Sequence, residues 1–200
     1  MAPIPKPFCT LAHESPDSPD VILPHCGSGS RSVGGMGRKR RSYGAVQAME
    51  IALYEPDIAH NTGAILRLGA CFSVPVHIIE PAGFDASDRA LKRAALDYLS
   101  SVLIERHPSF AAFEAWREES DRRLILLTTK ANTRYTDFCF DAQDVLLLGR
   151  ESAGVPDSVH GAADARLVIP LAPAMRSLNV ATAAAMVLGE ALRQTGGFDR

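Results

Sequence analysis

Three short strings in the sequence combine polar side chains and glycines in spacings that suit ligand binding and catalysis. The first, Asn61-x-Gly63-x-x-x-Arg67, offers an amide, a residue without a side chain and a guanidinium. On a helix Arg67 lies about 200° from Ile65, so its charge falls off the buried face. A guanidinium there can bind a phosphate or stabilise a developing oxyanion. Taken alone, the string also fits an N-cap at Asn61 and a solvated charge at Arg67.

The second string, Gly149-x-Glu151-x-x-Gly154, directly follows an apolar run. Its two glycines are similar in spacing to those of a phosphate-binding loop. However, no Lys-Ser/Thr pair follows Gly154, and the Gly-x-Gly-x-x-Gly fingerprint is absent. These features argue against a P-loop ATPase and a dinucleotide-binding enzyme. A simple turn after a strand is the alternative interpretation of the glycines.

The third string carries Ile169-Pro170 into Ser177-Leu178-Asn179 at the start of an alanine-rich segment. Ser177 is the expected N-cap of a helix that runs to Gln194 and stops at the glycines 196–197. Capping alone would account for a serine at this position.

The elements that position these strings follow from short apolar runs after Glu50. The runs have the length of buried parallel strands, and helical patterns separate several of them, which predicts an α/β fold. Ligands of such sheets bind at the carboxyl ends of the strands, where the strings fall. The predicted strands are 51–54, 76–79, 102–104, 124–127, 145–148 and 167–169.

Helical spacing places Ile65, Leu68 and Phe72 on one side of the first predicted helix. Two further helices are expected between the later strands. The predicted helices are 61–72, a helix capped by Ser87 or Asp88 that ends near Leu99, and 110–119 capped by Ser109.

Composition excludes several protein classes. The 200 residues are 46% hydrophobic and 22% charged, as in globular domains. The longest uncharged apolar run of the second half, 177–189, is too short to span a membrane, and early prolines argue against a secretory signal. Four cysteines without a Cys-x-x-Cys pair and six histidines without a ligand spacing predict neither a disulfide framework nor a metal site. We therefore expect a cytoplasmic protein without membrane or metal partners.

Residues 1–48 differ from the rest of the chain. They contain six prolines, six glycines and six serines with almost no apolar periodicity, which predicts a disordered extension before a folded domain at 49–200. The basic run 38–41 would act either as an arm towards phosphates or as part of a solvated tail. Met36 and Met49 are alternative initiators.

Together the three strings resemble the SPOUT superfamily of methyltransferases, in its SpoU-like RNA ribose 2′-O-methyltransferase branch. They occur in the family's order, and the resemblance covers residues 49–195. Arg150 departs from the pattern, since relatives often have proline there. Further segments are similar to the bacterial family that methylates the wobble nucleotide of tRNA, namely 54–56, 77–84, 91–98 and 127–130.

The resemblance implies a parallel sheet flanked by helices, with a C-terminal trefoil knot. It also implies S-adenosyl-L-methionine as the cofactor and an obligate homodimer whose sites are completed across the interface. The residues implied to bind the cofactor are Leu127, Thr128, Gly149, Ile169, Leu171, Ser177 and Leu178.

The implied reaction moves a methyl group from a sulfonium to a ribose 2′-oxygen, which is a weak nucleophile until its proton leaves or its charge is stabilised. By resemblance Arg67 is the activator, either as a base or by gripping the adjacent phosphate and stabilising the alkoxide. A guanidinium rarely gives up its proton, which favours the second role. Ser177 and Asn179 are implied to orient the reacting groups, and Glu151 to hold the loops or the arginine.

The catalytic domain must itself bind the tRNA anticodon loop, because the chain carries no separate RNA-binding domain. The candidate contacts are Asn61, Arg89, Lys92, Arg93 and Lys130, with ordinary solvation as the alternative for the charged ones. The expected function is thus 2′-O-methylation of cytidine or uridine 34 in tRNA. The alternatives are methylation of ribosomal RNA or another tRNA position, and a non-catalytic RNA-binding protein of the same fold.

Overall fold

The structure is a computed structural model that describes residues 49–85 and 89–198. The predicted extension, 1–48, lies outside the described residues, as do the helix caps expected at Ser87 and Asp88. Among the helices of the described ranges, none combines the length and apolar character that crossing a membrane requires.

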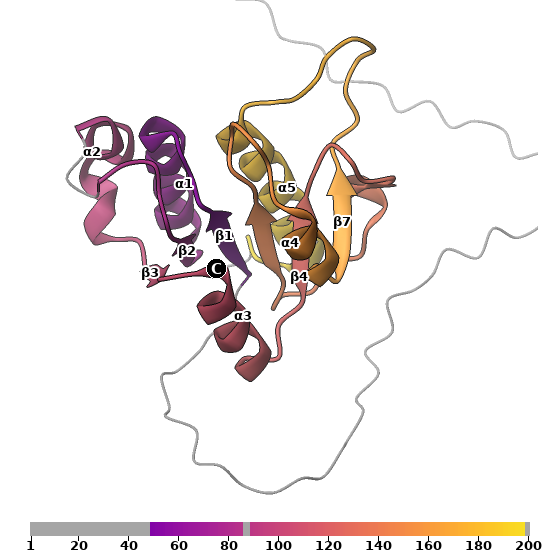
Figure 1. Ribbon diagram of the computed structural model, residues 1–200, viewed down its shortest axis with the longest axis horizontal. Coiled ribbons are helices and arrows are strands. Elements are labelled where there is room, and N and C mark those ends of the chain that lie inside the picture. Colours follow the sequence, from indigo (N-terminus) through magenta and orange to yellow (C-terminus); the bar gives the residue numbers. More distant parts are fainter. Residues whose placement is uncertain (1–48, 86–88, 199–200) are drawn as a thin grey trace, which may run out of the picture. The chain divides into compact units, whose positions relative to one another are not determined.

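The described strands form one parallel sheet in the order β3-β2-β1-β6-β4-β7-β5 (Figure 1). In the centre, Ala52 pairs with His77 on one side and with Leu147 on the other. The strands are β1 (Glu50–Tyr54), β2 (Val76–Ile79), β3 (Ile104–His107), β4 (Leu124–Leu127), β5 (Thr133–Arg134), β6 (Val145–Leu148) and β7 (Ala165–Val168). The predicted α/β fold with a parallel sheet is confirmed.

Helices cover both faces of the sheet, with α1 and α5 on one face and α3 and α4 on the other (Figure 1). Ile51 and Leu53 pack into the core beneath α1, α2 and α5, whereas Ala52 packs into the core beneath α3 and α4. The helices are α1 (Ala59–Phe72), α2 (Arg89–Ala95), α3 (Phe110–Glu119), α4 (Asp157–Ala162) and α5 (Val180–Thr195), with 3-10 turns η1 (Leu96–Ser100) and η2 (Tyr135–Asp137).

The central strands are buried on both faces, as their continuous apolar runs predict. Leu146 and Leu147 point to opposite cores and are both 0% exposed. Burial of one such side chain stabilises the fold by roughly 1.5–3 kcal/mol. The sheet is therefore a rigid base for the loops at its carboxyl edge.

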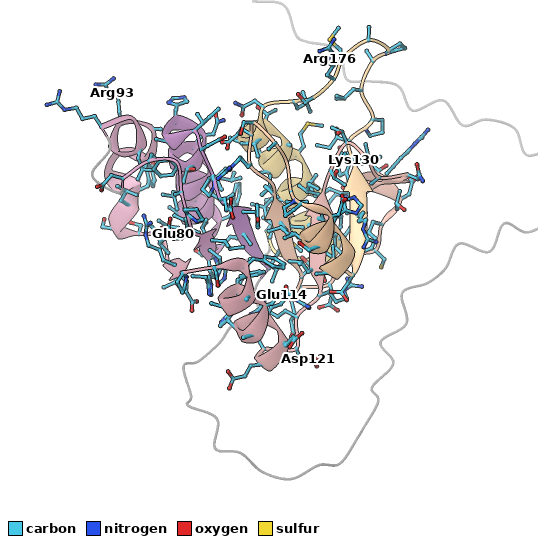
Figure 2. The ribbon with its side chains drawn as sticks, viewed as in Figure 1. Glu80, Arg93, Glu114, Asp121, Lys130 and Arg176 are labelled. Atoms are coloured by element: carbon cyan, nitrogen blue, oxygen red, sulfur yellow. The ribbon has the colours of Figure 1, made fainter. Side chains whose placement is uncertain are left out.

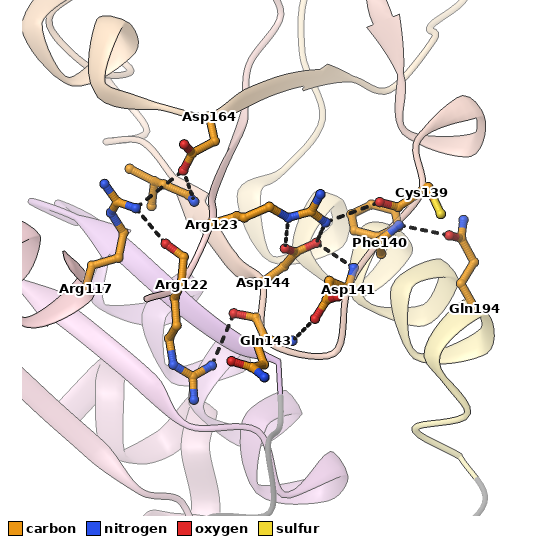
Figure 3. Close-up of polar contacts among 11 residues, drawn as sticks. Arg117, Arg122, Arg123, Cys139, Phe140, Asp141, Gln143, Asp144, Asp164 and Gln194 are labelled. Atoms are coloured by element: carbon orange, nitrogen blue, oxygen red, sulfur yellow. Dashed lines mark hydrogen bonds and ion pairs between the residues drawn. The ribbon is translucent and has the colours of Figure 1, made fainter. Parts of the chain in front are cut away.

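Buried Asp144 organises the opposite edge of the sheet, where β6 begins (Figure 3). Its carboxylate accepts two hydrogen bonds of 2.7 Å from the Arg123 guanidinium and one of 2.8 Å from the backbone N–H of Asp141. The ion pair raises the pKa of Arg123, mainly through these side-chain hydrogen bonds. The buried charge is thus fully partnered, as burial requires.

The outer strands differ from the prediction. The strand expected at 102–104 forms instead at 104–107, and Glu105 and Arg106 are exposed because β3 is an edge strand. The strand expected at 167–169 runs from Ala165 to Val168. Strand β5 was not predicted, because two exposed polar residues carry no apolar pattern.

Helix ends were predicted with mixed success. Ser109 caps α3 as expected, accepting a hydrogen bond from Ala112 N. Gly196 ends α5 with a positive φ of 68°, also as expected. The N-cap predicted at Ser177 is wrong: Asn179 caps α5, accepting from the N–H groups of Ala181 and Thr182. Helix α1 begins at Ala59, two residues before Asn61, and the expected α2 region becomes a short helix followed by a 3-10 turn.

Candidate active site

A pocket of about 480 Å³ opens at the carboxyl edge of the sheet, where the loops after β4, β6 and β7 meet. We call it the loop pocket. All seven residues implied to bind the cofactor line it: Leu127, Thr128, Gly149, Ile169, Leu171, Ser177 and Leu178. Asn61, Glu151 and Asn179 line it as well. The fold thus brings residues of all three sequence strings to one cavity, with Asn61 representing the first string.

The glycines of the second string give the loop after β6 its shape. Backbone hydrogen bonds run in both directions between Arg150 and Gly154, at 3.0 Å and 2.7 Å. A Cβ atom on Gly149 would stand 2.7 Å from the carbonyl carbon of Gly154, and Gly154 itself has a φ of 70°. The loop therefore needs glycine at both positions, the first for close approach and the second for a left-handed conformation.

Arg150, the residue that departs from the family pattern, ties this loop to the end of β1. Its Nε atom donates to the carbonyl oxygen of Glu55 at 3.1 Å, and its Nη2 atom lies 2.9 Å from the Glu55 carboxylate. The arginine thus fixes one wall of the loop pocket by contacts that a proline does not offer.

A chain of hydrogen bonds joins the three strings across the pocket wall. The Glu151 carboxylate accepts from the backbone N–H of Asp57 and from Asn61 Nδ2, both at 3.1 Å. Asn61 Oδ1 in turn accepts from Asn179 Nδ2 at 2.9 Å. Of the two roles expected for Glu151, these contacts correspond to holding the loops together.

The Glu151 carboxyl lies in a partly buried position that changes its proton affinity. Burial is the main cause that raises its pKa above the ordinary value, and a hydrogen bond with the Asp57 side chain raises it further. Asp57 shows the opposite shift, because hydrogen bonds from the side chains of Glu151 and then Ser152 lower its pKa. A single proton on this carboxyl pair would therefore favour Glu151 over Asp57.

Sequence reasoning did not identify Asp57, although it lies just after the end of β1. The Ser152 hydroxyl donates a hydrogen bond to its Oδ2 atom, whereas its buried Oδ1 atom has no hydrogen-bond partner. Position was the available signal, since acidic residues at the carboxyl ends of parallel strands commonly belong to sites. Other lining residues missed by sequence reasoning are apolar or small, and include Ile58, Val155, Val180 and Ala183.

Arg67 is not among the residues that line the loop pocket. Its side chain is exposed on α1, and its guanidinium carbon lies 5.3 Å from the ring centre of Tyr98. The predicted exposure is confirmed, and Ile65, Leu68 and Phe72 pack into the core on the other side of α1. Within one chain, the predicted activator and the predicted cofactor residues are therefore separate.

The basic residues predicted to contact RNA do not form one cluster. Arg93 lies at the α2 end of the molecule, whereas Lys130 projects from the loop after β4, on the other side of α5 (Figure 2). Arg89, Arg93 and Lys130 are all exposed. Lys92 lies on α2, but its side chain is outside the part of the chain that the structure describes.

Comparison with known proteins identifies a family and similar proteins for this chain. Residues 48–189 match the model of the SpoU rRNA Methylase family. A tRNA (cytidine(34)-2′-O)-methyltransferase of Beijerinckia indica is 64% identical over 148 residues, which cover 74% of this chain and 92% of that protein.

Solved structures show the same architecture. One, from work on 2-OH methylation of C/U34 on tRNA, is 36% identical with a TM-score of 0.70 over 74% of this chain and 95% of that one. Another is the SpoU methyltransferase AviRb from Streptomyces viridochromogenes in complex with the cofactor AdoMet, at 27% identity. Its TM-score is 0.69, and the match covers 74% of this chain and 58% of that chain.

Proposed function

Since the chain belongs to the SpoU rRNA methylase family, we propose that it methylates the ribose 2′-hydroxyl of nucleotide 34, a cytidine or uridine, in tRNA. S-adenosyl-L-methionine is the methyl donor. The observation that carries the proposal is that residues of all three family strings, among them Asn61, Glu151 and Ser177, line one pocket. The catalytic domain corresponds to residues 49–200, and its tRNA substrate places it in the cytoplasm.

The loop pocket fits the cofactor in size and chemistry. Its volume of about 480 Å³ lies within the range of roughly 300–1,000 Å³ that is usual for small-molecule sites. Leu127, Ile169 and Leu171 provide an apolar lining for an adenine ring, while Gly149 leaves its backbone accessible. When bound, the cofactor supplies an electrophilic methyl group on a sulfonium.

The chain's own residues position and activate the acceptor oxygen. Asn179 and Ser177 lie at the pocket, where they orient bound groups, and Glu151 holds the loops through Asp57 and Asn61. Arg67 grips the phosphate next to the acceptor ribose and stabilises the negative charge that develops on the 2′-oxygen. No metal takes part in this scheme.

A second copy of the chain supplies Arg67 to each site. This arrangement is supported by the position of Arg67, which is exposed on α1 and does not line the loop pocket of its own chain. Three large apolar side chains, Ile58, Leu178 and Met186, are 39–45% exposed near the pocket or on α5. A homodimer that covers these side chains would bring one protomer's α1 towards the partner's pocket. The trefoil knot of the family belongs to the same proposed architecture.

Exposed basic side chains then hold the anticodon loop from two directions. Arg89 and Arg93 extend from α2 of the protomer that donates Arg67, and Lys130 stands beside Thr128 and Thr129 of the pocket. In a dimer these groups can face the same bound RNA, because the protomer that supplies Arg67 and the protomer that supplies the loop pocket are different chains. Removal of one such phosphate contact should lower the affinity for RNA and make that affinity less dependent on salt.

Incubation of the purified protein with labelled S-adenosyl-L-methionine and bulk bacterial tRNA tests the function. Label in 2′-O-methylcytidine or 2′-O-methyluridine at position 34 is expected after digestion and site mapping. Ribosomal RNA serves as the parallel substrate. Label in ribosomal RNA but not in tRNA would support 2′-O-methyl transfer to RNA but refute the assignment of tRNA as the substrate.

A further inference from the structure

A second group of reactive side chains lies beneath α3, on β2 and β3. His77 of β2 pairs in register with Glu105 of β3, and His107 follows two residues later, so all three face the same side of the sheet. His77 and His107 are 1% and 5% exposed, whereas the Glu105 side chain is 46% exposed. Their ligand atoms all lie within 4.8 Å of one another. The fold thus assembles a donor set that the sequence spacing does not reveal.

The distances within this group suit a four-coordinate ion. His77 Nδ1 lies 2.9 Å from His107 Nε2 and 3.8 Å from Glu105 Oε2. Ligand atoms around a tetrahedral zinc ion with bonds of about 2.0–2.1 Å stand roughly 3.3–3.4 Å apart. The observed separations bracket this value, so small side-chain rotations would allow an ion to sit between the three atoms.

A second layer of contacts orients His77. Its other ring nitrogen, Nε2, lies 2.5 Å from Glu50 Oε2, and Glu50 Oε1 lies 2.9 Å from Arg122 Nη2. Arg122 also donates to the carbonyl oxygen of Gln143 (Figure 3). A carboxylate on Nε2 keeps the proton on that nitrogen, which directs the lone pair of Nδ1 towards His107 and Glu105. Histidine ligands of metal ions are usually held by such a carboxylate.

Aromatic side chains close the buried side of the group. The Trp116 ring centre lies 4.2 Å from that of His77, and the Phe113 ring centre lies 5.3 Å from that of His107. An apolar surround of this kind strengthens the attraction between a cation and its ligands. The exposed Glu105 leaves one side open to solvent, from which an ion can enter.

We propose that His77, His107 and Glu105 bind a divalent ion of the zinc class, with a water molecule at the fourth position. Two imidazoles and one carboxylate favour zinc and its neighbours over magnesium or calcium, which prefer oxygen ligands. The competing arrangement is a direct hydrogen bond between the two histidines, with no ion. The site is independent of the methyltransferase assignment, because none of its residues lines the loop pocket.

Trp116 makes the proposal testable, because it is the single tryptophan of the chain and lies against His77. The metal-free full-length protein is titrated with Co²⁺, a spectroscopic substitute for zinc, and then with Zn²⁺ in competition. We expect one equivalent of Co²⁺ to produce visible absorption of a four-coordinate site and to quench the tryptophan fluorescence. Zn²⁺ should reverse both signals.

Two variants and a control locate the bound ion. Glu105→Gln removes an exposed ligand with little risk to the fold, and we expect it to weaken Co²⁺ binding at least tenfold. His107→Gln should abolish the quenching, with circular dichroism verifying that the protein remains folded. His60→Gln, an exposed histidine on α1, should bind like the wild type. Absence of quenching in the wild type, or equal affinity in Glu105→Gln and His60→Gln, would overturn the proposal in favour of the hydrogen-bonded histidine pair.

Discussion

Asn179 donates a hydrogen bond of 2.9 Å to Asn61, a residue 118 positions earlier in the chain. The same asparagine caps α5, because its Oδ1 atom accepts from the N–H groups of Ala181 and Thr182. One side chain therefore fixes the start of α5 and links the first string to the third. Because the two contacts use different atoms of Asn179, different substitutions can separate its effect on stability from its effect on activity.

Asn179→Asp should keep the cap but lose the link to Asn61, because a carboxylate accepts hydrogen bonds and does not donate one when ionised. We expect thermal stability close to that of the wild type and methyl transfer lowered by up to about tenfold, the size of one lost hydrogen bond. Asn179→Ala should lose the cap as well, at a cost of about 1 kcal/mol in the free energy of unfolding. Thermal denaturation and initial rates on tRNA measure the two effects. Equal stability of both variants would contradict the capping role.

Arg67→Ala should lower methyl transfer by about 10²–10³-fold, as the loss of a group that stabilises developing charge typically does. Binding of S-adenosylhomocysteine, measured by calorimetry, should stay unchanged, because Arg67 does not line the loop pocket. Loss of binding together with activity would refute the assignment of Arg67 to the chemical step.

Mixed dimers test whether Arg67 acts on the partner's site. Arg67→Ala and Asn179→Asp protomers are mixed in equal amounts, unfolded and refolded together. If Arg67 serves the partner, half of the dimers contain one intact site, and about a quarter of the wild-type activity appears above the residual activity of the Asn179→Asp protein. No recovery, or a monomer in light scattering at micromolar concentration, would show that the site is not shared.

The raised pKa of Glu151 predicts a fall in stability as pH increases. Because its folded pKa exceeds the ordinary value of 4.5, the folded chain binds this proton more tightly than the unfolded chain. The stabilisation is complete below pH 4.5 and is lost as pH rises through the folded pKa. Glu151→Gln should flatten this fall, measured as the free energy of unfolding in urea at several pH values. Asp57 has a lowered pKa, so its contribution to the free energy of unfolding is present above pH 3.8 and is lost as pH falls through its folded pKa.

A matched control for that series is Glu118→Gln, which changes an exposed glutamate on α3. It should retain the pH dependence of the wild type. A Glu151→Gln protein with an unchanged slope would mean that burial does not hold the proton on Glu151.

Gly149→Ala should damage the loop pocket, because its Cβ atom would meet the backbone of Gly154 at 2.7 Å. We expect a loss of roughly 1–3 kcal/mol in stability, typical of overpacking, together with weaker S-adenosylhomocysteine binding. Gly161→Ala is the control, since its added Cβ meets nothing within 4 Å in α4. That variant should bind normally and be slightly more stable, because alanine favours a helix over glycine. Normal binding of S-adenosylhomocysteine by Gly149→Ala would contradict the conclusion that the loop after β6 has no room for a side chain at position 149.

The central strands could be predicted from the sequence because both of their faces are buried. Continuous apolar runs such as 145–148 are typical of strands that are buried on both faces. The edge strands carry a weaker signal: β3 exposes Glu105 and Arg106, and β5 contains two exposed residues. Their positions depend on pairing with β2 and β7, which is a tertiary contact.

The family resemblance supplied seven of the residues that line the loop pocket, and their types alone would not have singled them out. Local reasoning chose Ser177 as the cap of α5, although Asn179 has the same capping ability and lies at the observed helix start. It did not find the partnership of Asp57 with Glu151, whose residues are 94 positions apart. Nor did it find the group at His77, because strand register creates it.

The most direct test of the account uses two tRNA substrates that differ in one oxygen atom. One carries an ordinary cytidine at position 34 and the other a 2′-deoxycytidine there, with all remaining nucleotides unchanged. Transfer of labelled methyl from S-adenosyl-L-methionine is measured for both under the same conditions. The account predicts label in the first and none in the second. Equal labelling of the two substrates would contradict it, because the methyl group would then be carried by a different atom.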